Sequence, residues 1–355
     1  MTEVPASEAV LPADDTALPR TGSDSAESDS AGSGSAGTGR AGTGRAGTAP
    51  GNPRTTRTGR RARHRRRLRE YALFLALVAP NFLLLGVFSY WPVVYNAYLS
   101  LTEWDMIAPV KRFVGLDNYV DLLTGGEFPG VLRTTAYFMV GVVGGSLLLG
   151  LAVAVLLNQR LRGRGLVRTM VFAPHVLSGA AVGLAWLFIF DPNYGLSRFL
   201  FELVGADSPA WLTDSDRALP AIIVVYLWKN IGFCAIVYLA GLQNLPKDLY
   251  ESAALDGAGP WRVFRRITLP LLSPVTFFLT VTTIISSFQA FDVIAVMTDG
   301  GPGGATTILS WYVYDKGFSD FQAGPAASGA MVMFAILLVV TLLQTRYLER
   351  KVHYR

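Results

Sequence analysis

The chain has 355 residues, of which 51% are hydrophobic and 16% are charged, whereas soluble domains usually have about 25% charged residues. Its formal net charge is +5, but the basic excess is local, because 11 arginines and no acid lie between Arg40 and Arg69, before the first long apolar run. This placement is typical of the cytoplasmic flank of a membrane helix and argues against nucleic-acid binding. The single cysteine, Cys234, excludes an intrachain disulfide framework and is expected to be a packing residue.

The first 65 residues are of low complexity and consist largely of Ala, Gly, Ser, Thr, Asp and Arg. They hold too little apolar surface to offset the entropy lost on ordering, so residues 1–65 are predicted to be a disordered basic tail. The tail is not a secretory signal peptide, because its basic run comes late and the apolar run behind it is too long. Residues 66–355 are predicted to be one all-α transmembrane domain.

Six stretches from Tyr71 onward have the roughly 20 mainly apolar residues that a membrane span needs. Pro80, Pro174 and Pro274 are expected to kink the helices without preventing them, because neighbouring groups can satisfy the freed carbonyls. The predicted spans are approximately residues 71–95, 134–157, 168–190, 218–242, 271–297 and 325–346.

The charges of the connecting loops predict the orientation of the spans. Residues 158–168 carry four arginines and no acid, and residues 244–266 and the segment from Arg346 carry four basic residues each. By contrast, residues 96–133 carry five acids against three basic residues, and residues 191–217 carry five against two. Because Lys and Arg collect on the cytoplasmic side, both termini are expected to be cytoplasmic, which agrees with an even number of spans.

Short structured segments are expected in the outer loops. Residues 113–120 have the pattern of a turn that opens a short interfacial helix, and residues 191–195 have Pro and Gly placed as in a tight turn. Residues 299–304 are a glycine cluster without the lysine and following helix of a phosphate-binding loop. Since no Gly-x-x-x-x-Gly-Lys-Ser/Thr pattern occurs anywhere, the chain is not expected to bind ATP in the usual way.

No enzyme-like grouping of residues is present in the sequence. The three histidines, His64, His175 and His353, have no carboxylate or cysteine at metal-ligand spacing. The acids cluster in the outer loops, where a solvated surface is the ordinary explanation. We therefore predict no catalytic residue, no metal site and no cofactor bound by this chain.

Polar residues inside the spans are the candidates for a solute path, because a charge in lipid costs roughly 2.5 kcal/mol or more. They could be hydrogen-bonding glue between packed helices, or they could line a water-filled path for a polar solute. The two interpretations are balanced for Ser286, and the path is favoured for Lys229, Gln289 and Asp292. The polar positions are Lys229 and Asn230 in the fourth span, and Thr282, Ser286, Gln289 and Asp292, at helical spacing along one stripe, in the fifth.

Aromatic residues flank this stripe, Phe288 among them. Sugars present apolar faces together with hydroxyls, so they suit aromatic side chains mixed with amides. Aromatic residues also have structural roles in packing and at membrane interfaces, and for any single one that role is favoured. The residues predicted to line a substrate path are Lys229, Asn230, Ser286, Phe288, Gln289 and Asp292.

The stretch between the fourth and fifth spans is much longer than a turn requires. Residues 248–255 are predicted to be a short helix that stops at Gly257, and Pro260 can start a second helix. Small residues there let another backbone approach closely, and Glu251 offers a fixed charge beside them. A plain helical hairpin explains the Gly and Pro, but not so long a loop with an acid beside alanines. We therefore expect this corner to receive a push from a partner protein.

The same stretch resembles the signature loop of the permease subunits of ABC importers, which reads Glu-Ala-Ala, three residues, Gly, nine residues, Ile-x-Leu-Pro. The chain departs from this pattern at Ser252, which replaces the first Ala, and at Ala254, where many sugar permeases have a basic residue. The matching residues are Glu251, Ala253, Gly257, Ile267, Leu269 and Pro270, with further likeness at 113–119, 193–195, 242–257 and 297–302. Over about residues 70–350 the sequence is similar to permeases of carbohydrate ABC importers of the maltose and glycerol-3-phosphate type.

The resemblance implies a type I ABC-importer permease fold with six transmembrane helices and both termini cytoplasmic. It places a signature core at about residues 130–346 and a cytoplasmic coupling loop at residues 244–270, which would dock in a cleft of a cytoplasmic ATPase. Glu251 would contact the ATPase, and Gly257 would make the corner. The coupling residues implied in this way are Glu251, Ser252, Ala253, Ala254, Asp256, Gly257, Ile267, Leu269 and Pro270.

Four partners follow from the resemblance: a second homologous permease, an ATPase dimer that uses ATP and Mg, an extracytoplasmic solute-binding protein, and the lipid bilayer of a bacterial cell membrane. The Gly-Gly-Pro sequence at residues 300–302 resembles the subunit class that pairs with a different permease. ATP binding would close the ATPase pair and turn the permeases outward-facing, and hydrolysis would reset them. No nucleic acid is expected among the partners.

The alternative function is a self-contained secondary transporter or channel for a polar solute, in which Asp292 and Lys229 would form a proton or ion site. The long cytoplasmic loop and the lack of a detectable inverted repeat argue against it. A membrane-embedded enzyme is disfavoured by the absence of any catalytic grouping. The sequence leaves the solute open between disaccharide, oligosaccharide, polyol and glycerophosphate.

Overall fold

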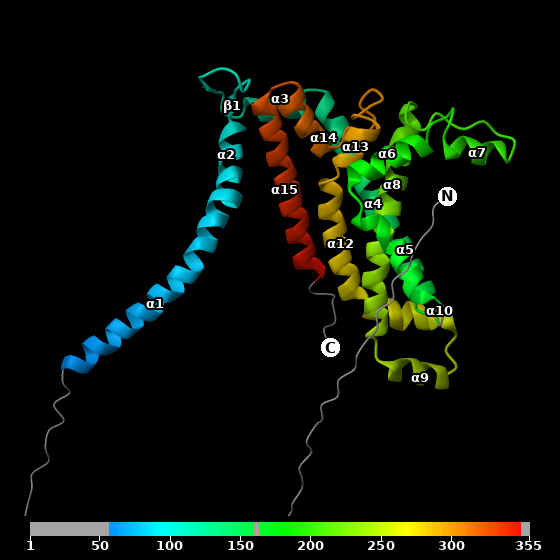
Figure 1. Ribbon diagram of the computed structural model, residues 1–355, viewed down its shortest axis with the longest axis horizontal. Coiled ribbons are helices and arrows are strands. Elements are labelled where there is room, and N and C mark those ends of the chain that lie inside the picture. The colour runs from blue at the N-terminus through cyan, green and yellow to red at the C-terminus, as the bar shows by residue number, and fades with distance from the viewer. Residues whose placement is uncertain (1–56, 160–162, 349–355) are drawn as a thin grey trace, which may run out of the picture. The chain divides into compact units, whose positions relative to one another are not determined.

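The structure is a computed structural model that describes residues 57–159 and 163–348, and most of them are helical (Figure 1). Residues Arg69–Arg355 form one compact unit. Among the described residues five helices are long and apolar enough to cross a membrane, and a sharply bent helix pair makes a sixth if counted as one span. The five are Tyr71–Leu99, Glu127–Leu157, Ser215–Gln243, Ser273–Met297 and Ala323–Arg346. The prediction of an all-α polytopic membrane protein is confirmed, with the third of its six spans in two pieces.

The first span runs without a break through α1 (Arg57–Leu85), the π-turn η1 (Gly86–Tyr90) and α2 (Trp91–Leu99). Pro80 lies inside α1 and does not end it. Because α1 begins at Arg57, residues 57–65 of the predicted tail are helical, and residues 1–56 lie outside the described part of the chain. The most apolar part of this span is 0% buried within the chain, so lipid or another chain has to cover it.

The centre of the unit is formed by α4 (Glu127–Leu157) and α8 (Ser215–Gln243), which pack along one another. Small residues allow the close approach, since a Cβ atom built at Gly150 would lie 2.5 Å from the Cβ atom of Cys234. Cys234 is fully buried at this contact, as its place in an apolar run predicted.

The third span is broken rather than kinked. α5 (Arg164–Val176) and α6 (Gly179–Ile189) meet at an angle of 100°. A single helix was predicted over residues 168–190, but Leu177 and Ser178 both adopt extended backbone angles, which end a helix. The two halves pack on different neighbours, α5 on α8 and α6 on α13 (Asp292–Met297).

Residues 247–270, called the coupling corner below, are helical on both sides of a turn, as predicted. The second helix continues through a π-turn into the fifth span, with Pro270 inside α11 and only Leu272 between the last two segments. The elements are α9 (Lys247–Leu255), α10 (Pro260–Val263), η2 (Phe264–Thr268), α11 (Leu269–Leu271) and α12 (Ser273–Phe288).

The fifth span is also interrupted. α12 ends at Phe288, and α13 begins at Asp292. Between them Gln289 and Phe291 leave the helical region, with φ/ψ of −91°/5° and −129°/−50°. The prediction of one continuous polar stripe from Thr282 to Asp292 is therefore wrong for its last part, because Asp292 starts a new helix.

The end of the unit away from the coupling corner carries the short elements of the remaining loops (Figure 1). The short helix predicted near residues 113–120 is confirmed as α3, where Asn118 Nδ2 donates to the carbonyls of Ser100 and Thr102 at 2.9 and 3.0 Å. The predicted turn at 191–195 is closed by Asp191 Oδ1, which accepts from two backbone N–H groups. The elements are β1 (Thr102–Glu103) paired antiparallel with β2 (Arg112–Phe113), α3 (Asp117–Thr124), α7 (Leu196–Glu202), α14 (Leu309–Tyr314), η3 (Asp315–Ser319) and the last span, α15 (Ala323–Leu348).

Candidate functional site: a coupling corner and a polar junction

Backbone hydrogen bonds fix the geometry of the coupling corner. Gly257 has a φ of +68°, a left-handed conformation that favours glycine. The N–H of Ala258 donates to the carbonyl of Ala253 at 2.9 Å, and the N–H of Gly257 donates to that of Ala254 at 3.1 Å. This pair of bonds is a Schellman motif, which satisfies two carbonyls at the end of α9 and turns the chain toward α10.

α9 presents a partly apolar face outside the unit. Ala253 is buried against the rest of the chain, whereas its neighbours point outward. Leu255 is 90% exposed, which is unusual for a leucine at the end of a helix, and the sequence analysis did not single it out. The exposed members of the predicted coupling set on this side are Glu251, Ser252, Ala254, Asp256 and Gly257.

The remaining three coupling residues lie apart from this face. Ile267 belongs to η2, and Leu269 and Pro270 belong to α11, where the second helix runs into the fifth span. Ile267 is half-buried, and Leu269 and Pro270 are exposed. The signature therefore covers two places, the exposed corner itself and the entry of the span that the corner leads into.

A side-chain hydrogen bond ties the two helices of the corner together. The hydroxyls of Tyr250 in α9 and Thr268 in η2 lie 3.0 Å apart. A cavity of about 430 Å³ lies behind α9, lined by Asn158, Gln243 and Phe264 together with residues of both helices. Besides the backbone, the Tyr250–Thr268 contact therefore joins α9 to η2.

The second candidate feature is a polar junction of three residues, Gly179, Tyr226 and Asp292. The Tyr226 hydroxyl of α8 donates to Asp292 Oδ1 at 3.1 Å, and the same oxygen accepts the N–H of Val293 at 2.9 Å. A Cβ atom built at Gly179 would lie 1.5 Å from Asp292 Oδ2, so the carboxylate rests directly on the glycine. Asp292 forms no ion pair with any described residue.

The other residues of the predicted substrate path are placed differently from one another. Asn230 is buried and donates to the carbonyl of Tyr226 at 2.9 Å, and Phe288 is 4% exposed in a packed apolar cluster. Ser286 and Gln289 are exposed. Lys229 is half-buried and forms no ion pair within the described ranges. The structure therefore does not gather the six residues in one pocket, and their role as a path stays a prediction.

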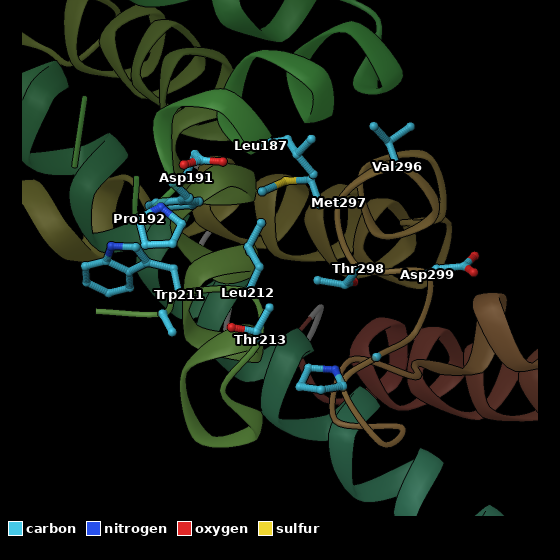
Figure 2. A pocket seen from close by; sticks show the side chains of 14 residues that line it. Leu187, Asp191, Pro192, Trp211, Leu212, Thr213, Val296, Met297, Thr298 and Asp299 are labelled. Atoms are coloured by element: carbon cyan, nitrogen blue, oxygen red, sulfur yellow. The ribbon is translucent and has the colours of Figure 1, made fainter. Parts of the chain in front are cut away.

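A cavity of about 550 Å³ opens at the far end of the unit (Figure 2). Its walls combine apolar side chains with two carboxylates, Asp191 and Asp299, and the indole of Trp211. Leu187 of α6 and Met297 of α13 are both among the side chains that line it (Figure 2). The cavity could not be predicted from the sequence, because its walls come from three separate segments, residues 187–192, 210–213 and 296–302.

Comparisons with known proteins agree with this architecture. The family model described as "Binding-protein-dependent transport system inner membrane component" matches residues 146–354. The chain is 35% identical to the probable ABC transporter permease protein PH1215 of Pyrococcus horikoshii, over 79% of this chain and 98% of that protein. It is 34% identical to the sn-glycerol-3-phosphate transport system permease protein UgpA of Agrobacterium fabrum, over 78% of this chain and 95% of that one.

The fold is similar to that of a solved bacterial ABC transporter involved in the import of the acidic polysaccharide alginate. The TM-score is 0.70 and the identity is 24%, with 81% of this chain and 99% of the other covered. Fold and site together define a membrane-embedded transport subunit. The chain belongs to the family of binding-protein-dependent transport system inner membrane components, and it is a permease subunit of an ABC importer.

Proposed function

We propose that this chain is the transmembrane subunit of an ATP-binding-cassette importer that moves a sugar or sugar-like solute into the cytoplasm, driven by a separate ATPase. The observation that carries this proposal is the coupling corner. Its exposed α9 is continued by a nearly unbroken helix from Pro260 to Phe288. A push on α9 therefore reaches the membrane span directly. A secondary transporter does not require such a corner, and the family membership supports the importer.

The complete importer would contain further partners. A second, homologous permease and lipid would cover the unburied first span, and an ATPase dimer with ATP and Mg would receive α9. A solute-binding protein would dock on the far end. The chain would lie in the bacterial cell membrane with both termini cytoplasmic, as the arginine-rich loops suggest, and would bind no cofactor itself.

The class of solute is supported by the relatives and by one residue of the chain. UgpA is named for a glycerol phosphate, and the alginate transporter for an acidic polysaccharide. Both compounds combine hydroxyls with negative charge. Lys229 offers a positive charge inside a span, where such a group is costly unless it has a function. A polyhydroxylated solute, including one with an acidic group, fits this arrangement.

The experiment that tests the proposal is recovery of the cognate ATPase with wild-type and Glu251→Ala permease. Loss of a charge-assisted hydrogen bond costs roughly 1.5–3 kcal/mol, so we expect the ATPase to bind at least about tenfold more weakly. Membrane insertion should be unchanged, because Glu251 is exposed and has no partner among the described residues. Glu202→Ala, an exposed acid in α7 at the other end, is the matched control and should bind normally.

Equal recovery with the Glu251 variant and the control would contradict the docking role. A second measurement tests the orientation. Leu255→Cys in a Cys234→Ala background places one exposed thiol on the corner, and a membrane-impermeant maleimide should label it in inside-out vesicles only. Labelling in right-side-out vesicles would place the corner on the wrong side for an ATPase. Uptake by vesicles without ATP, driven by a proton gradient alone, would replace the importer with the secondary transporter.

A further inference from the structure

The two interruptions in the spans lie against each other. The break in the third span ends at Gly179, the first residue of α6, and the break in the fifth span ends at Asp292, the first residue of α13. All three heavy atoms nearest to a Cβ atom built at Gly179 belong to the Asp292 carboxyl group, at 1.5, 2.0 and 2.5 Å. Two independent breaks, more than a hundred residues apart in the chain, are therefore joined by a single side-chain contact.

The two half-spans beyond the breaks pack closely on each other. One turn after Gly179, a Cβ atom built at Gly183 would lie 3.1 Å from the Cβ atom of Val296, one turn after Asp292. Two glycines four residues apart form a flat helix face that lets a neighbouring helix approach in a membrane. The half-spans on the other side of the breaks have different packing neighbours. There α5 packs on α8, and α12 packs on α4 and α8.

Tyr226 fixes the position of the carboxylate. It comes from α8, which spans the unit without a break, and its hydroxyl donates to Asp292 Oδ1. Tyr226 is itself held by an edge-to-face contact with Phe138 of α4, with ring centroids 5.1 Å apart. The carboxylate is thus held between a fixed donor and the glycine at the start of α6.

We infer that Asp292 is a positioning residue whose carboxylate fastens α13 to α6 where both spans are interrupted, so that these two half-spans move as one body. The fastening follows from the contacts of this chain alone. The movement rests on the proposed function, because it is the coupling corner that would drive it. A push carried along the helix from Pro260 to Phe288 would first meet the non-helical segment at residues 289–291, directly before Asp292.

A double-mutant cycle on the full chain in lipid nanodiscs tests the fastening without any transport. In Gly179→Ala the added methyl group occupies the place of the carboxylate, so the Asp292 side chain has to leave. We expect Gly179→Ala and Asp292→Ala to lower the Tm by similar amounts, roughly 3 °C or more. The double variant should melt no lower than Asp292→Ala, because the clash is with Asp292 itself.

Gly183→Ala is the matched control for the cycle. Its methyl group would meet Val296 and not Asp292, so its effect on Tm should be the same with and without Asp292. Additive losses for Gly179→Ala and Asp292→Ala would mean that Gly179 is needed for another reason and would overturn the fastening. This result would leave the proposed function untouched.

A cross-link tests the movement. Gly183→Cys with Val296→Cys, in a Cys234→Ala background, brings the two Cβ atoms within a few tenths of an ångström of the roughly 3.5–4.5 Å that a disulfide needs. In the complex reconstituted with its ATPase, second permease and binding protein, we expect the oxidised variant to keep stimulation of ATP hydrolysis by the binding protein. We expect Gly179→Ala alone to lower this stimulation, and the same cross-link should restore it. Loss of stimulation on oxidation, with recovery on reduction, would mean that α6 and α13 separate during the cycle and would overturn the inference.

Discussion

The packing of α5 on α8 yields a stability prediction that depends on one glycine. A Cβ atom built at Gly232 would lie 1.9 Å from the carbonyl oxygen of Val171 and 3.0 Å from the Cα atom of Phe172, both backbone atoms of α5. Since real Cβ contacts are not shorter than 3.0 Å, α5 has to retreat by about 1.1 Å, the difference between 3.0 and 1.9 Å. Gly232→Ala forces this retreat, because no side-chain rotation can relieve a clash with backbone.

Two opposing terms set the magnitude. Overpacking of this kind costs about 1–3 kcal/mol, and replacing a helical glycine by alanine returns up to about 1 kcal/mol. Because the clash is with backbone, the upper part of the first range applies, and the net loss is about 1–2 kcal/mol. For a chain of 355 residues, this corresponds to a fall in Tm of roughly 1.5–3 °C. Tryptophan fluorescence of the full chain in nanodiscs measures the Tm. All variants are heated at one scan rate, because thermal unfolding of such proteins is usually irreversible.

Gly144→Ala is the matched control, because Gly144 is also in a long span and has no heavy atom within 4 Å of a built Cβ atom. It should leave the Tm unchanged or raise it slightly. A Gly232→Ala variant that melts with the wild type and the control would refute the close approach of α5 to α8. Either result also tests the packing of α5 beside Lys229, because this residue lies one turn before Gly232 on α8.

Three further predictions concern the two ends of the unit and the tail. Tyr250→Phe removes the hydroxyl that meets Thr268, so stimulated ATP hydrolysis of the complex should fall severalfold while ATPase binding, measured by co-purification, is retained; unchanged coupling would refute the role of this contact. Burial opposes the charge of Lys316, but the hydrogen bond to Asp320 and nearby carboxylates outweigh it and raise the pKa of the ammonium group. The raised pKa means that charged Lys316 stabilises the folded state fully at pH values below the unfolded pKa near 10.4, and that this stabilisation is lost as the pH rises through the folded pKa. The Tm of Lys316→Met should therefore be lower than that of the wild type at pH 7, and the two Tm values should converge only in strong alkali. A difference in Tm that persists in strong alkali would refute the electrostatic origin. Deletion of residues 1–55 should leave uptake unchanged, and loss of uptake would show that the tail takes part in transport.

Sequence reasoning located the spans well because hydropathy over twenty residues is a strong signal. It missed the breaks at residues 177–178 and 289–291, since the non-helical angles at Leu177 and Phe291 depend on what packs against them. Pro174 pointed to a kink and gave no indication of a 100° bend. The prediction of one uninterrupted polar stripe was wrong for the same reason, because it assumed that the helical spacing continues past Gln289.

The coupling corner was predicted closely because its determinants are local. Gly257 and Pro260 carry their backbone preferences in the sequence itself. The polar junction could not be predicted, because the contact between Gly179 and Asp292 joins two spans through the fold. Its only sequence signal was a carboxylate within an apolar run, and that signal was assigned to a solute path.

The π-turn η2, between α10 and α11, has a consequence for the direction in which α9 points. A π-turn contains one residue more than the α-helix around it, and one residue corresponds to about 100° of rotation in an α-helix. Removing a single residue from Phe264–Thr268 would therefore turn the whole corner about the axis of the fifth span by roughly that angle, with the span itself unchanged. In the proposed complex, this one extra residue would set the direction from which α9 meets the ATPase.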